Sequence, residues 1–404
     1  MARCRVVLSI EPISPSGEFF YSLPPSKSHM IRFMAMAAQG KKTLKIEIAS
    51  EPGGDIHSMA NCLEKMGVEI EMGVTEWLIK PPKDGLSAPD STLNCGNSGT
   101  VARIMTAIAA CFDEEITIDG DESLRSRECP ELAFALRELD VEVSSTNLPC
   151  TVCGSISGGK ISLEMGRSSQ PLTALILASP KFSEEVVIDC IGESVSTGYL
   201  EITGLAAGIF GSPITKTNDK ISINSFDPSG PESLGIPPEL SLYPMGILCA
   251  ELHHDLDVKM EIYPYDQSMI SSFDQLTKLD GGELNLQNTS DIISPAAAYL
   301  ALKNGGRITG VAHARGKESN RIMKTVELLN KFGLFCKPTA DGLVIAGGQR
   351  PKRPVEPVDT HGDHRLAMTA VLLATSCGGE IINPEVSAVT HPEFLGQIGV
   401  LSSL

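Results

Sequence analysis

The segment SKSHMIR (residues 26–32) is a short polar motif that opens an Ala- and Met-rich run of about a dozen residues, long enough for a helix. Five further segments open similar apolar runs: NSGTVAR (97–103), SSQPLTA (168–174), PELSLYP (238–244), SDIISPA (290–296) and GDHRLAM (362–368). Ser28 and Ser98 are 70 residues apart, and Asp291 and Asp363 are 72 apart, whereas Ser241 and Asp291 are only 50 apart. Self-similarity at a nearly fixed period indicates one supersecondary unit used repeatedly.

Strand-like segments alternate with these helices, for example TLKIEIAS (43–50), EVVIDC (185–190) and GRITGVA (306–312). A second series, which includes LEKMGVEIE (63–71) and LNKFGLF (329–335), combines a helix end, a turn residue and an exposed strand. Alternating helices and strands predict an α/β architecture with sheets packed on helices.

Two Gly- and Pro-rich breaks indicate where domains meet: SLPPS (22–26) and DPSGPESLGIPPE (227–239). A chain of 404 residues is too long for one core and suits two domains. We expect one domain over residues 24–237 and the other over 1–22 with 240–404. The chain would then cross between the domains twice, near 22–26 and 227–239, which suits a hinged cleft.

The composition excludes several classes of protein. A formal net charge of −17 argues against a nucleic-acid partner, because duplex binding needs a basic surface. No apolar run approaches the ~20 residues that span a bilayer, and the N-terminal segment lacks the apolar core of a signal peptide. The 11 cysteines are scattered singly, which is typical of reduced thiols in the cytosol. We therefore expect a cytoplasmic protein without a membrane partner.

The sequence also lacks familiar metal and nucleotide motifs. Cys150 and Cys153 form the one CxxC pair, and no second pair follows at zinc spacing. The pairs His253–His254 and His361–His364 have no carboxylate or Cys partner at a familiar spacing. Neither a P-loop nor GxGxxG is present, so nucleotide binding has no support.

Several predicted helices carry a cationic side chain at or near their N-terminus, where a positive charge opposes the helix dipole. The first turn of a helix has free N–H groups and the positive end of the helix dipole, so it attracts anions. Ser, Asn, Asp and Thr there can be ordinary caps. Capping does not explain the cations in or beside these starts, which are Lys27, Arg32, Arg103, Arg321 and Arg365. Several helix N-termini with basic side chains would hold a polyanionic small molecule.

Four clusters combine cations with groups that can move protons: PPSKSHMIR (24–32), DESLRSRECP (121–130), RGKESNR (315–321) and HGDHR (361–365). Each has a structural alternative, such as a solvated charged turn or an Asp363 helix cap. Together with Asp291 and Glu318, these cations suit proton transfer on a phosphorylated substrate, because burial and neighbours can tune Lys and Glu toward neutral pKa values. No nucleophile elbow is visible, so covalent hydrolysis has little support.

Seven blocks resemble the signature segments of the 5-enolpyruvylshikimate-3-phosphate synthase family, in that family's order and with comparable spacing across nearly the whole chain. They are LPPSKSHMIR, GNSGTVAR, LRSRECPEL, SSQPLTALILASP, STGYLEIT, RGKESNR and GDHRLAM. The related UDP-N-acetylglucosamine enolpyruvyl transferase shares the repeat but would lack SKS…R, KES..R and DHR in this combination.

The resemblance implies a two-domain inside-out α/β barrel, each domain built from three βαβαββ repeats with pseudo-threefold symmetry. It implies that the 5-hydroxyl of shikimate 3-phosphate adds to C2 of phosphoenolpyruvate, and that the tetrahedral intermediate then loses phosphate. Neither a metal nor an organic cofactor is implied, and we expect a monomer. Gly99 would leave room beside the enolpyruvate, which in this family also admits glyphosate.

The resemblance also implies roles residue by residue. Asp291 would be the base at the 5-hydroxyl, with Glu318 and Lys27 as proton carriers. Shikimate 3-phosphate would be held by Lys27, Ser28, Arg32, Ser168, Ser169, Gln170, Ser196, Tyr199, Asp291 and Lys317. Phosphoenolpyruvate would be held by Lys27, Asn97, Gly99, Arg127, Gln170, Arg321 and Arg365.

Some positions depart from the family's pattern. Val389 stands where the family carries a Lys, which predicts weaker phosphoenolpyruvate binding or compensation by Lys352 or Arg353. The fourth repeat, PPELSLYP, has Glu239 in place of an Asp, and the fifth, residues 268–282, lacks the usual Met-Gly-Ala ending. Two alternatives to the synthase follow: an enolpyruvyl transferase for another hydroxylated acceptor, and a catalytically impaired anion-binding homologue.

Overall fold

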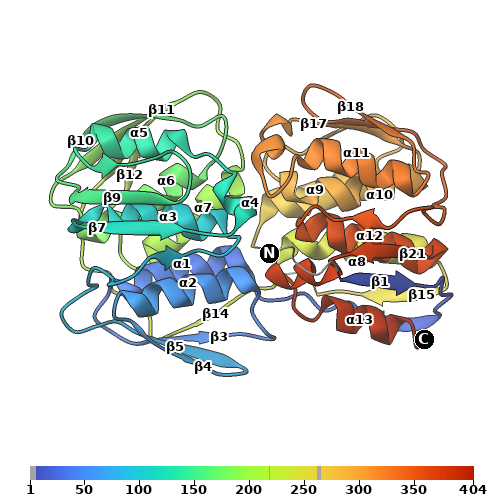
Figure 1. Cartoon of the computed structure of the whole chain (residues 1–404), viewed down its shortest axis with the longest axis horizontal. Coiled ribbons are helices and arrows are strands. Elements are labelled where there is room, and N and C mark those ends of the chain that lie inside the picture. The colour runs from blue at the N-terminus through green and yellow to red at the C-terminus, as the bar shows by residue number, and fades with distance from the viewer. Residues whose placement is uncertain (1–5, 218, 262–264) are drawn as a thin grey trace. The chain divides into compact units, whose positions relative to one another are not determined.

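The computed structural model describes residues 6–217, 219–261 and 265–404 (Figure 1). The chain divides into two compact units. The middle unit is Pro25–Pro237, and the terminal unit joins Met1–Pro24 to Pro238–Leu404. The chain passes from one unit to the other twice, and each time it does so between two consecutive prolines.

Three four-stranded mixed sheets make up the strands of the middle unit. In each sheet the first two strands are parallel and the remaining two pairings are antiparallel. The first sheet has the order β14 (Ser233–Gly235), β3 (Leu44–Glu47), β5 (Glu76–Lys80) and β4 (Glu69–Met72). The second is β6 (Leu93–Asn94), β7 (Cys111–Asp119), β9 (Cys150–Ser155) and β8 (Glu142–Val143). The third is β10 (Gly159–Glu164), β11 (Val186–Ile191), β13 (Lys220–Ile223) and β12 (Thr215–Thr217).

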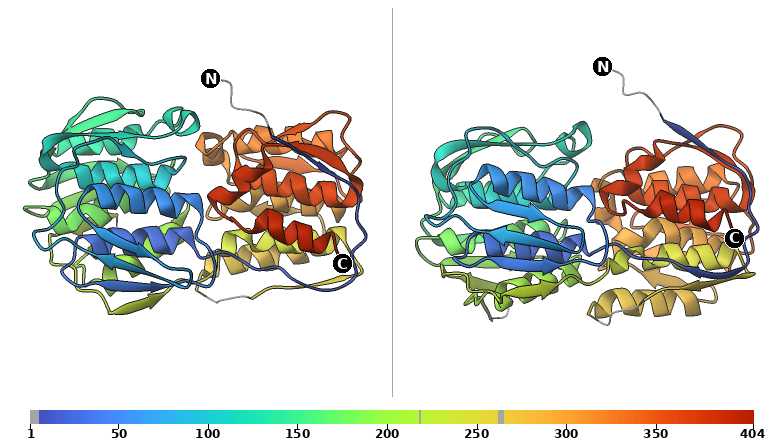
Figure 2. Two further views of the ribbon diagram at one scale, coloured as in Figure 1. Left: turned by 60° about the horizontal axis from the view of Figure 1, so that its bottom comes forward. Right: turned by 90° about the horizontal axis from the view of Figure 1, so that it is seen from below.

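The core of the middle unit is built on helices that are apolar on nearly every face. Seven α-helices occur among its described residues: α1 (Lys27–Ala38), α2 (Gly54–Lys65), α3 (Gly99–Ala109), α4 (Glu122–Arg125), α5 (Pro130–Glu138), α6 (Gln170–Ala178) and α7 (Thr197–Ile209). Helices α1, α3 and α6 are buried along almost their whole length. A helix that is hydrophobic all round belongs inside a protein, which explains their Ala-, Met- and Leu-rich sequences. Figures 1 and 2 show the strands of this unit toward its outside.

The terminal unit contains one sheet of the same order and two smaller ones. The four-stranded sheet is β16 (Glu283–Asn285), β17 (Gly306–Thr309), β19 (Leu343–Ile345) and β18 (Cys336–Pro338). The N-terminal strands complete the other two, because β1 (Val7–Ile10) pairs with β21 (Gly379–Ile382), and β2 (Gly17–Phe20) pairs with β15 (Leu256–Lys259). Strand β20 (Val358–Asp359) lies on the other side of β21.

The terminal unit contains both fully buried helices and amphipathic helices. They are α8 (Tyr243–Leu252), α9 (Gln267–Lys278), α10 (Ile293–Leu302), α11 (Arg321–Lys331), α12 (His364–Cys377) and α13 (Phe394–Leu401). Every residue of α10 and most of α12 are buried. The three helices α8, α10 and α12 pack on one another and form the centre of this unit's core.

All six motifs predicted to open helices do so. Helices α1, α3, α6 and α12 begin within their motifs, while a 3-10 turn comes first at the other two: Leu240–Leu242 before α8 and Ser290–Ile292 before α10. Proline follows within the first turn of α8 and α10, where its missing N–H is tolerated. No helix in the described part of the chain is both long enough and apolar enough to cross a bilayer.

Candidate functional site

Lys27 is the first residue of α1 and forms an ion pair with a carboxylate on the neighbouring helix α2. Its Nζ lies 2.8 Å from Oδ2 of Asp55, whose side chain is 8% exposed. Asp55 belongs to the first turn of α2, where a carboxylate is favoured by the helix dipole. Sequence reasoning missed Asp55, although the segment GGD (53–55) at the beginning of a helix was a usable signal. The pair holds Lys27 in place without neutralising the other cations.

Arg32 uses its guanidinium to join helices. Nε donates to Thr203 Oγ1 at 2.8 Å, Nη1 to the Ser28 carbonyl at 2.7 Å, and Nη2 to the Tyr199 carbonyl at 3.3 Å. Thr203 Oγ1 also lies 2.9 Å from Thr173 Oγ1 on α6. These bonds connect α1, α6 and α7 within the first two turns of each helix, so Arg32 helps to hold the three helices together near their beginnings.

The other residues expected to hold shikimate 3-phosphate lie at the same helix starts. Ser168 and Ser169 precede α6, and the backbone N–H of Gln170 donates to Ser168 Oγ at 3.1 Å. Ser196 precedes α7 in the left-handed conformation, with φ of 57°, and Tyr199 lies in the first turn. Every middle-unit residue that the sequence assigned to this substrate therefore lies directly before α1, α6 or α7 or within its first two turns.

A second group in the middle unit surrounds the start of α3. Asn97 Nδ2 donates to Asp121 Oδ2 at 2.7 Å, and Asn97 Oδ1 accepts from Arg127 Nη2 at 2.7 Å. Asp121 therefore orients Asn97, which in turn orients Arg127. A methyl group on Gly99 would lie 3.1 Å from Arg103 Nη1 and 3.5 Å from Gln170 Oε1. Gly99, Asn97, Arg127 and Gln170 are thus close neighbours, as a shared ligand would require.

The terminal unit concentrates charge around Arg321, the first residue of α11, which is only 1% exposed. Its Nε donates to Asp363 Oδ2 at 2.9 Å, its Nη1 to Asp291, and its Nη2 pairs with Glu318. Lys317 Nζ donates to the same Asp291 oxygen at 2.8 Å. Buried charges of both signs are balanced here, which limits the cost of removing them from water.

This arrangement shifts the pKa values of two predicted catalytic groups. Burial alone would raise the pKa of Asp291, but Lys317, Arg321 and Arg365 outweigh it and hold the pKa well below 3.8. Burial lowers the pKa of Lys317, and attraction to Asp291 offsets only part of this effect. Asp291 is therefore ionised at neutral pH, and Lys317 gives up a proton more readily than an exposed lysine.

Arg365 is held by the segment that precedes α8. Its Nη1 donates to the Ser241 carbonyl at 2.6 Å and its Nη2 to Ser241 Oγ at 2.6 Å. Ser241 Oγ in turn donates to Glu239 Oε1. All three side chains are at least nine-tenths buried. The Ser241 hydroxyl thus connects the Glu239 carboxylate to the Arg365 guanidinium. This bridging role of Ser241 was not predicted from the sequence.

The two cations expected to compensate for Val389 lie elsewhere. Arg353 forms a bidentate pair with Glu11, at 2.9 and 3.1 Å, and lies against Gly378 at the far end of α12 from Arg365. Lys352 lies against Gly333, beyond the last turn of α11, whereas Arg321 begins that helix. The positions of both residues speak against the expected compensation.

Comparison with known proteins identifies the family of this chain. The family model of EPSP synthase (3-phosphoshikimate 1-carboxyvinyltransferase) matches residues 16–241 and 246–398. A 3-phosphoshikimate 1-carboxyvinyltransferase of Korarchaeum cryptofilum is 32% identical over 96% of this chain and 97% of its own. One of Rhizobium etli is 29% identical over 99% and 98%. A solved EPSP synthase of Acinetobacter baumannii superposes with a TM-score of 0.77 at 22% identity over 98% of each chain. This chain belongs to the EPSP synthase family.

Proposed function

We propose that this chain transfers the enolpyruvyl group of phosphoenolpyruvate to the 5-hydroxyl of shikimate 3-phosphate and releases phosphate, as a transferase of the shikimate pathway. The observation that carries the proposal is the family match across both units, residues 16–241 and 246–398. The clusters around Lys27, Arg127 and Arg321 supply the cations that two phosphorylated substrates need.

The charge distribution fits an addition–elimination reaction. Shikimate 3-phosphate binds at the starts of α1, α6 and α7, where free backbone N–H groups and Lys27 favour a phosphate. Arg127, Arg321 and Arg365 hold the carboxylate and phosphate of phosphoenolpyruvate. Because Asn97, Asp363 and Ser241 already orient these arginines, they stabilise developing charge without reorganising.

Proton transfer is divided among Asp291, Glu318 and Lys27. Asp291 accepts the proton of the 5-hydroxyl, and Glu318 and Lys27 deliver and remove the proton at C3. The low pKa of Asp291 makes it a weak base in the free protein. The substrate therefore has to draw Lys317 or Arg321 toward its own phosphate or carboxylate, which raises the basicity of Asp291 at the moment of reaction.

The same family suggests a finer description of the fold. We propose that each unit is an inside-out α/β barrel of three βαβαββ repeats, with helices within and sheets outside. The shared strand order of four of the sheets supports this, and so does the burial of α1, α3, α6, α8, α10 and α12. The two units would be the domains of a hinged enzyme that works as a cytoplasmic monomer without a metal or organic cofactor.

Phosphorus NMR of the purified protein with both substrates tests the function. Inorganic phosphate together with a new enolpyruvyl product resonance is expected. Suppose that no reaction occurs while calorimetry still detects binding of shikimate 3-phosphate. The phosphoenolpyruvate site has then been lost because Val389 replaces the lysine that the family carries at this position. If neither reaction nor binding occurs, the protein acts on a different hydroxylated acceptor.

A further inference from the structure

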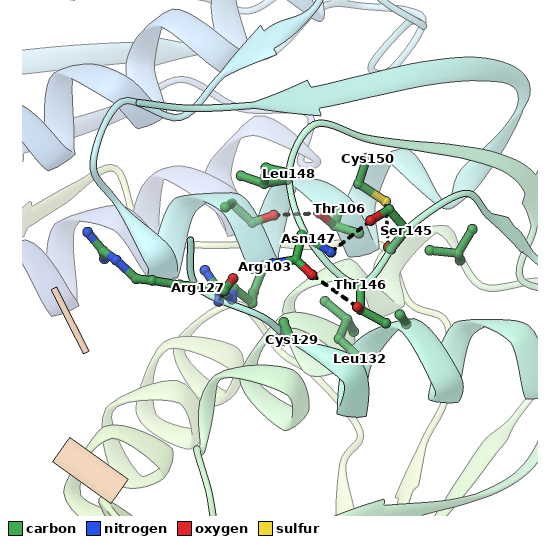
Figure 3. Close-up of a pocket in the computed structure, with 13 residues that line it drawn as sticks. Arg103, Thr106, Arg127, Cys129, Leu132, Ser145, Thr146, Asn147, Leu148 and Cys150 are labelled. Carbon is green, nitrogen blue, oxygen red and sulfur yellow. Dashed lines mark hydrogen bonds between the residues drawn. The ribbon is translucent and has the colours of Figure 1, made fainter. Parts of the chain in front are cut away.

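One sheet of the terminal unit ends after its second strand. In each four-stranded sheet, the second strand is parallel to the first and antiparallel to the third, as β7 is to β6 and β9. Figure 3 labels Cys150, the first residue of β9, where the chain enters such a third strand. Strand β21 also has an antiparallel partner, which is β1. Strand β15, by contrast, pairs only with β2 in the part of the chain that the structure describes. We call its other side the open edge of β15.

The length of the chain explains why this sheet has no third strand. In the first sheet of the middle unit, residues 66–92 connect α2 to β6 and contain the hairpin of β4 and β5. In the terminal unit, residues 279–282 connect α9 directly to β16. Two paired strands and their turn need about eight residues or more, so no hairpin fits into this connection. The open edge of β15 is therefore a property of the sequence.

The backbone of Val258 faces the open edge. The Tyr21 N–H donates to the Lys259 carbonyl at 2.8 Å, so Lys259 directs its backbone groups toward β2. Alternate residues of a strand direct these groups to opposite edges, so the N–H and C=O of Val258 point away from β2. Among the described residues, no hydrogen bond reaches the Val258 backbone from that side. The edge thus presents one donor and one acceptor from a single residue, as an antiparallel partner strand requires.

Asp257 and Lys259, on either side of Val258, make this edge complementary to itself. Both side chains are exposed, and Lys259 Nζ lies 2.6 Å from Asp257 Oδ2 within the strand. In an antiparallel pair of two β15 strands centred on Val258, this residue would exchange both backbone hydrogen bonds with Val258 of the partner subunit. Asp257 would then lie opposite the partner's Lys259, and Lys259 opposite the partner's Asp257. Opposite charges directly across two strands are favourable, whereas like charges are not.

We propose that the open edge of β15 binds the same edge of a second copy of this chain. The interface is isologous, and β2 and β15 of both copies together form one four-stranded sheet. The monomer proposed above remains the catalytic unit, because β15 supplies no residue of the candidate site. A strand of only 4 residues buries little surface, so the pair is weak and forms as the protein concentration rises.

Sedimentation equilibrium of the full chain tests for this association, at concentrations from about 10 μM to about 1 mM. The mean mass is expected to rise from that of one chain toward that of two. The mass of one chain at every concentration would overturn the proposal. Asp257 and Lys259 would then serve to keep the edge unpaired, as charged residues do on many edge strands.

Two charge-reversal variants locate the interface. Lys259→Asp places like charges across the paired strands and should weaken association at least about tenfold. Asp257→Lys should do the same with positive charges. When the two variants are mixed in equal amounts they should associate with each other, because every pair across the strands is again of opposite sign. Undiminished association of Lys259→Asp alone, or no association in the mixture, would overturn the proposal.

Two further variants separate strand pairing from net charge. Lys278→Asp makes the same change of charge at an exposed position of α9 and should leave association unaltered. Val258→Pro removes the N–H at the open edge, a position where an edge strand tolerates proline, and should abolish association. If Val258→Pro does not fold, the mixture of charge-reversal variants still decides the question. Equal weakening by Lys278→Asp and Lys259→Asp would show that net charge alone controls association, and would refute the pairing of β15.

Discussion

At the scale of single residues, Arg321 shows how one side chain can connect binding and proton transfer. It is almost completely buried and contacts three carboxylates, Asp291, Glu318 and Asp363. Two of these three are predicted to move protons. Because they share one guanidinium, a change in the charge of one carboxylate alters how strongly the others are stabilised.

Replacing Glu318 with Gln is therefore expected to stop the chemistry while preserving binding. The amide cannot carry the proton, and general acid–base catalysis typically contributes about 10²–10⁴-fold to the rate. It still fills the same space beside Arg321. We expect the turnover rate to fall by at least about a hundredfold, measured by phosphate release, with the Kd for both substrates changed little in calorimetry.

A matched control exists on the same helix. Glu327 is half-exposed and pairs with Lys324 on the surface of α11. Glu327→Gln should leave the rate of phosphate release unchanged. If Glu318→Gln turns over as fast as this control, Glu318 carries no proton in the reaction.

Asp291 gives a prediction about stability and pH. Its pKa is lowered in the folded protein, so its stabilising contribution is present above the pKa of an unfolded aspartate, about 3.9, and is lost as pH falls through the folded value. Asp291→Asn leaves Lys317 and Arg321 short of one counter-charge and should cost about 3–5 kcal/mol at neutral pH. Urea unfolding of both proteins across the acid range measures the difference.

The difference between Asp291→Asn and the unaltered chain should shrink only at strongly acidic pH, where the aspartate becomes neutral too. Asp274→Asn removes an exposed carboxylate paired with Lys278 and should cost less than about 1 kcal/mol at any pH. A constant difference between Asp291→Asn and the unaltered chain down to the lowest pH that allows folding would mean that the Asp291 charge does not stabilise the fold.

Sequence reasoning could propose residues of the candidate site, but it could not predict most of the contacts that hold them. Lys27, Arg127, Arg321 and Arg365 could be named because they stand in recognisable motifs. The partners of Lys27, Asn97 and Arg365, which are Asp55, Asp121 and Ser241, could not be identified from sequence alone, because 28, 24 and 124 residues separate the members of each pair. Contacts at such separations are set by how helices pack, which one sequence does not reveal.

At the scale of elements, the apolar runs in the sequence predicted where the helices lie, but they did not predict the residue at which each α-helix begins. The patterns around Ser241 and Asp291 predicted helices, but both begin with a 3-10 turn and the α-helix follows. Caps explain part of this difference, because only some motifs cap by side chain: Ser98 accepts from the Val101 N–H and Asp363 from the Arg365 N–H, whereas Ser26 and Ser169 do not cap. Where no side chain caps the helix, its first residue depends on tertiary contacts.

The side chain of Gln397 on the last helix, α13, forms hydrogen bonds to the backbone of the N-terminal segment. Gln397 Oε1 accepts from the Ser22 N–H at 3.2 Å, and Gln397 Nε2 donates to the Ser22 carbonyl at 3.1 Å. Gln397→Ala would leave both part-buried backbone groups without this partner. We expect a loss of about 1–3 kcal/mol in the free energy of unfolding, measured in urea.

Gln275 offers the comparison for this change. It is exposed on α9 and bonds only to Ser271 among the described residues. Gln275→Ala should change the unfolding free energy by no more than about 0.5 kcal/mol. Equal losses for the two variants would show that Gln397 contributes helix propensity rather than the bond to Ser22.

At the scale of the whole molecule, an acidic chain has to bind two anions. With a formal net charge of −17, its global field repels them, so affinity has to come from cations held locally. The structure divides these cations between the middle unit, with Lys27 and Arg127, and the terminal unit, with Lys317, Arg321 and Arg365. The chain crosses between the two units at Pro24–Pro25 and Pro237–Pro238. Proline restricts φ at these crossings, which limits the directions in which the chain can bend there.

Binding of one substrate pair by residues of both units has to fix the units against each other. We therefore expect the radius of gyration in small-angle X-ray scattering to fall when shikimate 3-phosphate and phosphoenolpyruvate are both added to Glu318→Gln, which should bind them without turnover. Unphosphorylated shikimate should have no such effect, because it lacks the phosphate that the helix starts attract. An unchanged radius with both ligands bound by calorimetry would mean that one unit binds them alone, and the cations of the other unit would then need a different explanation.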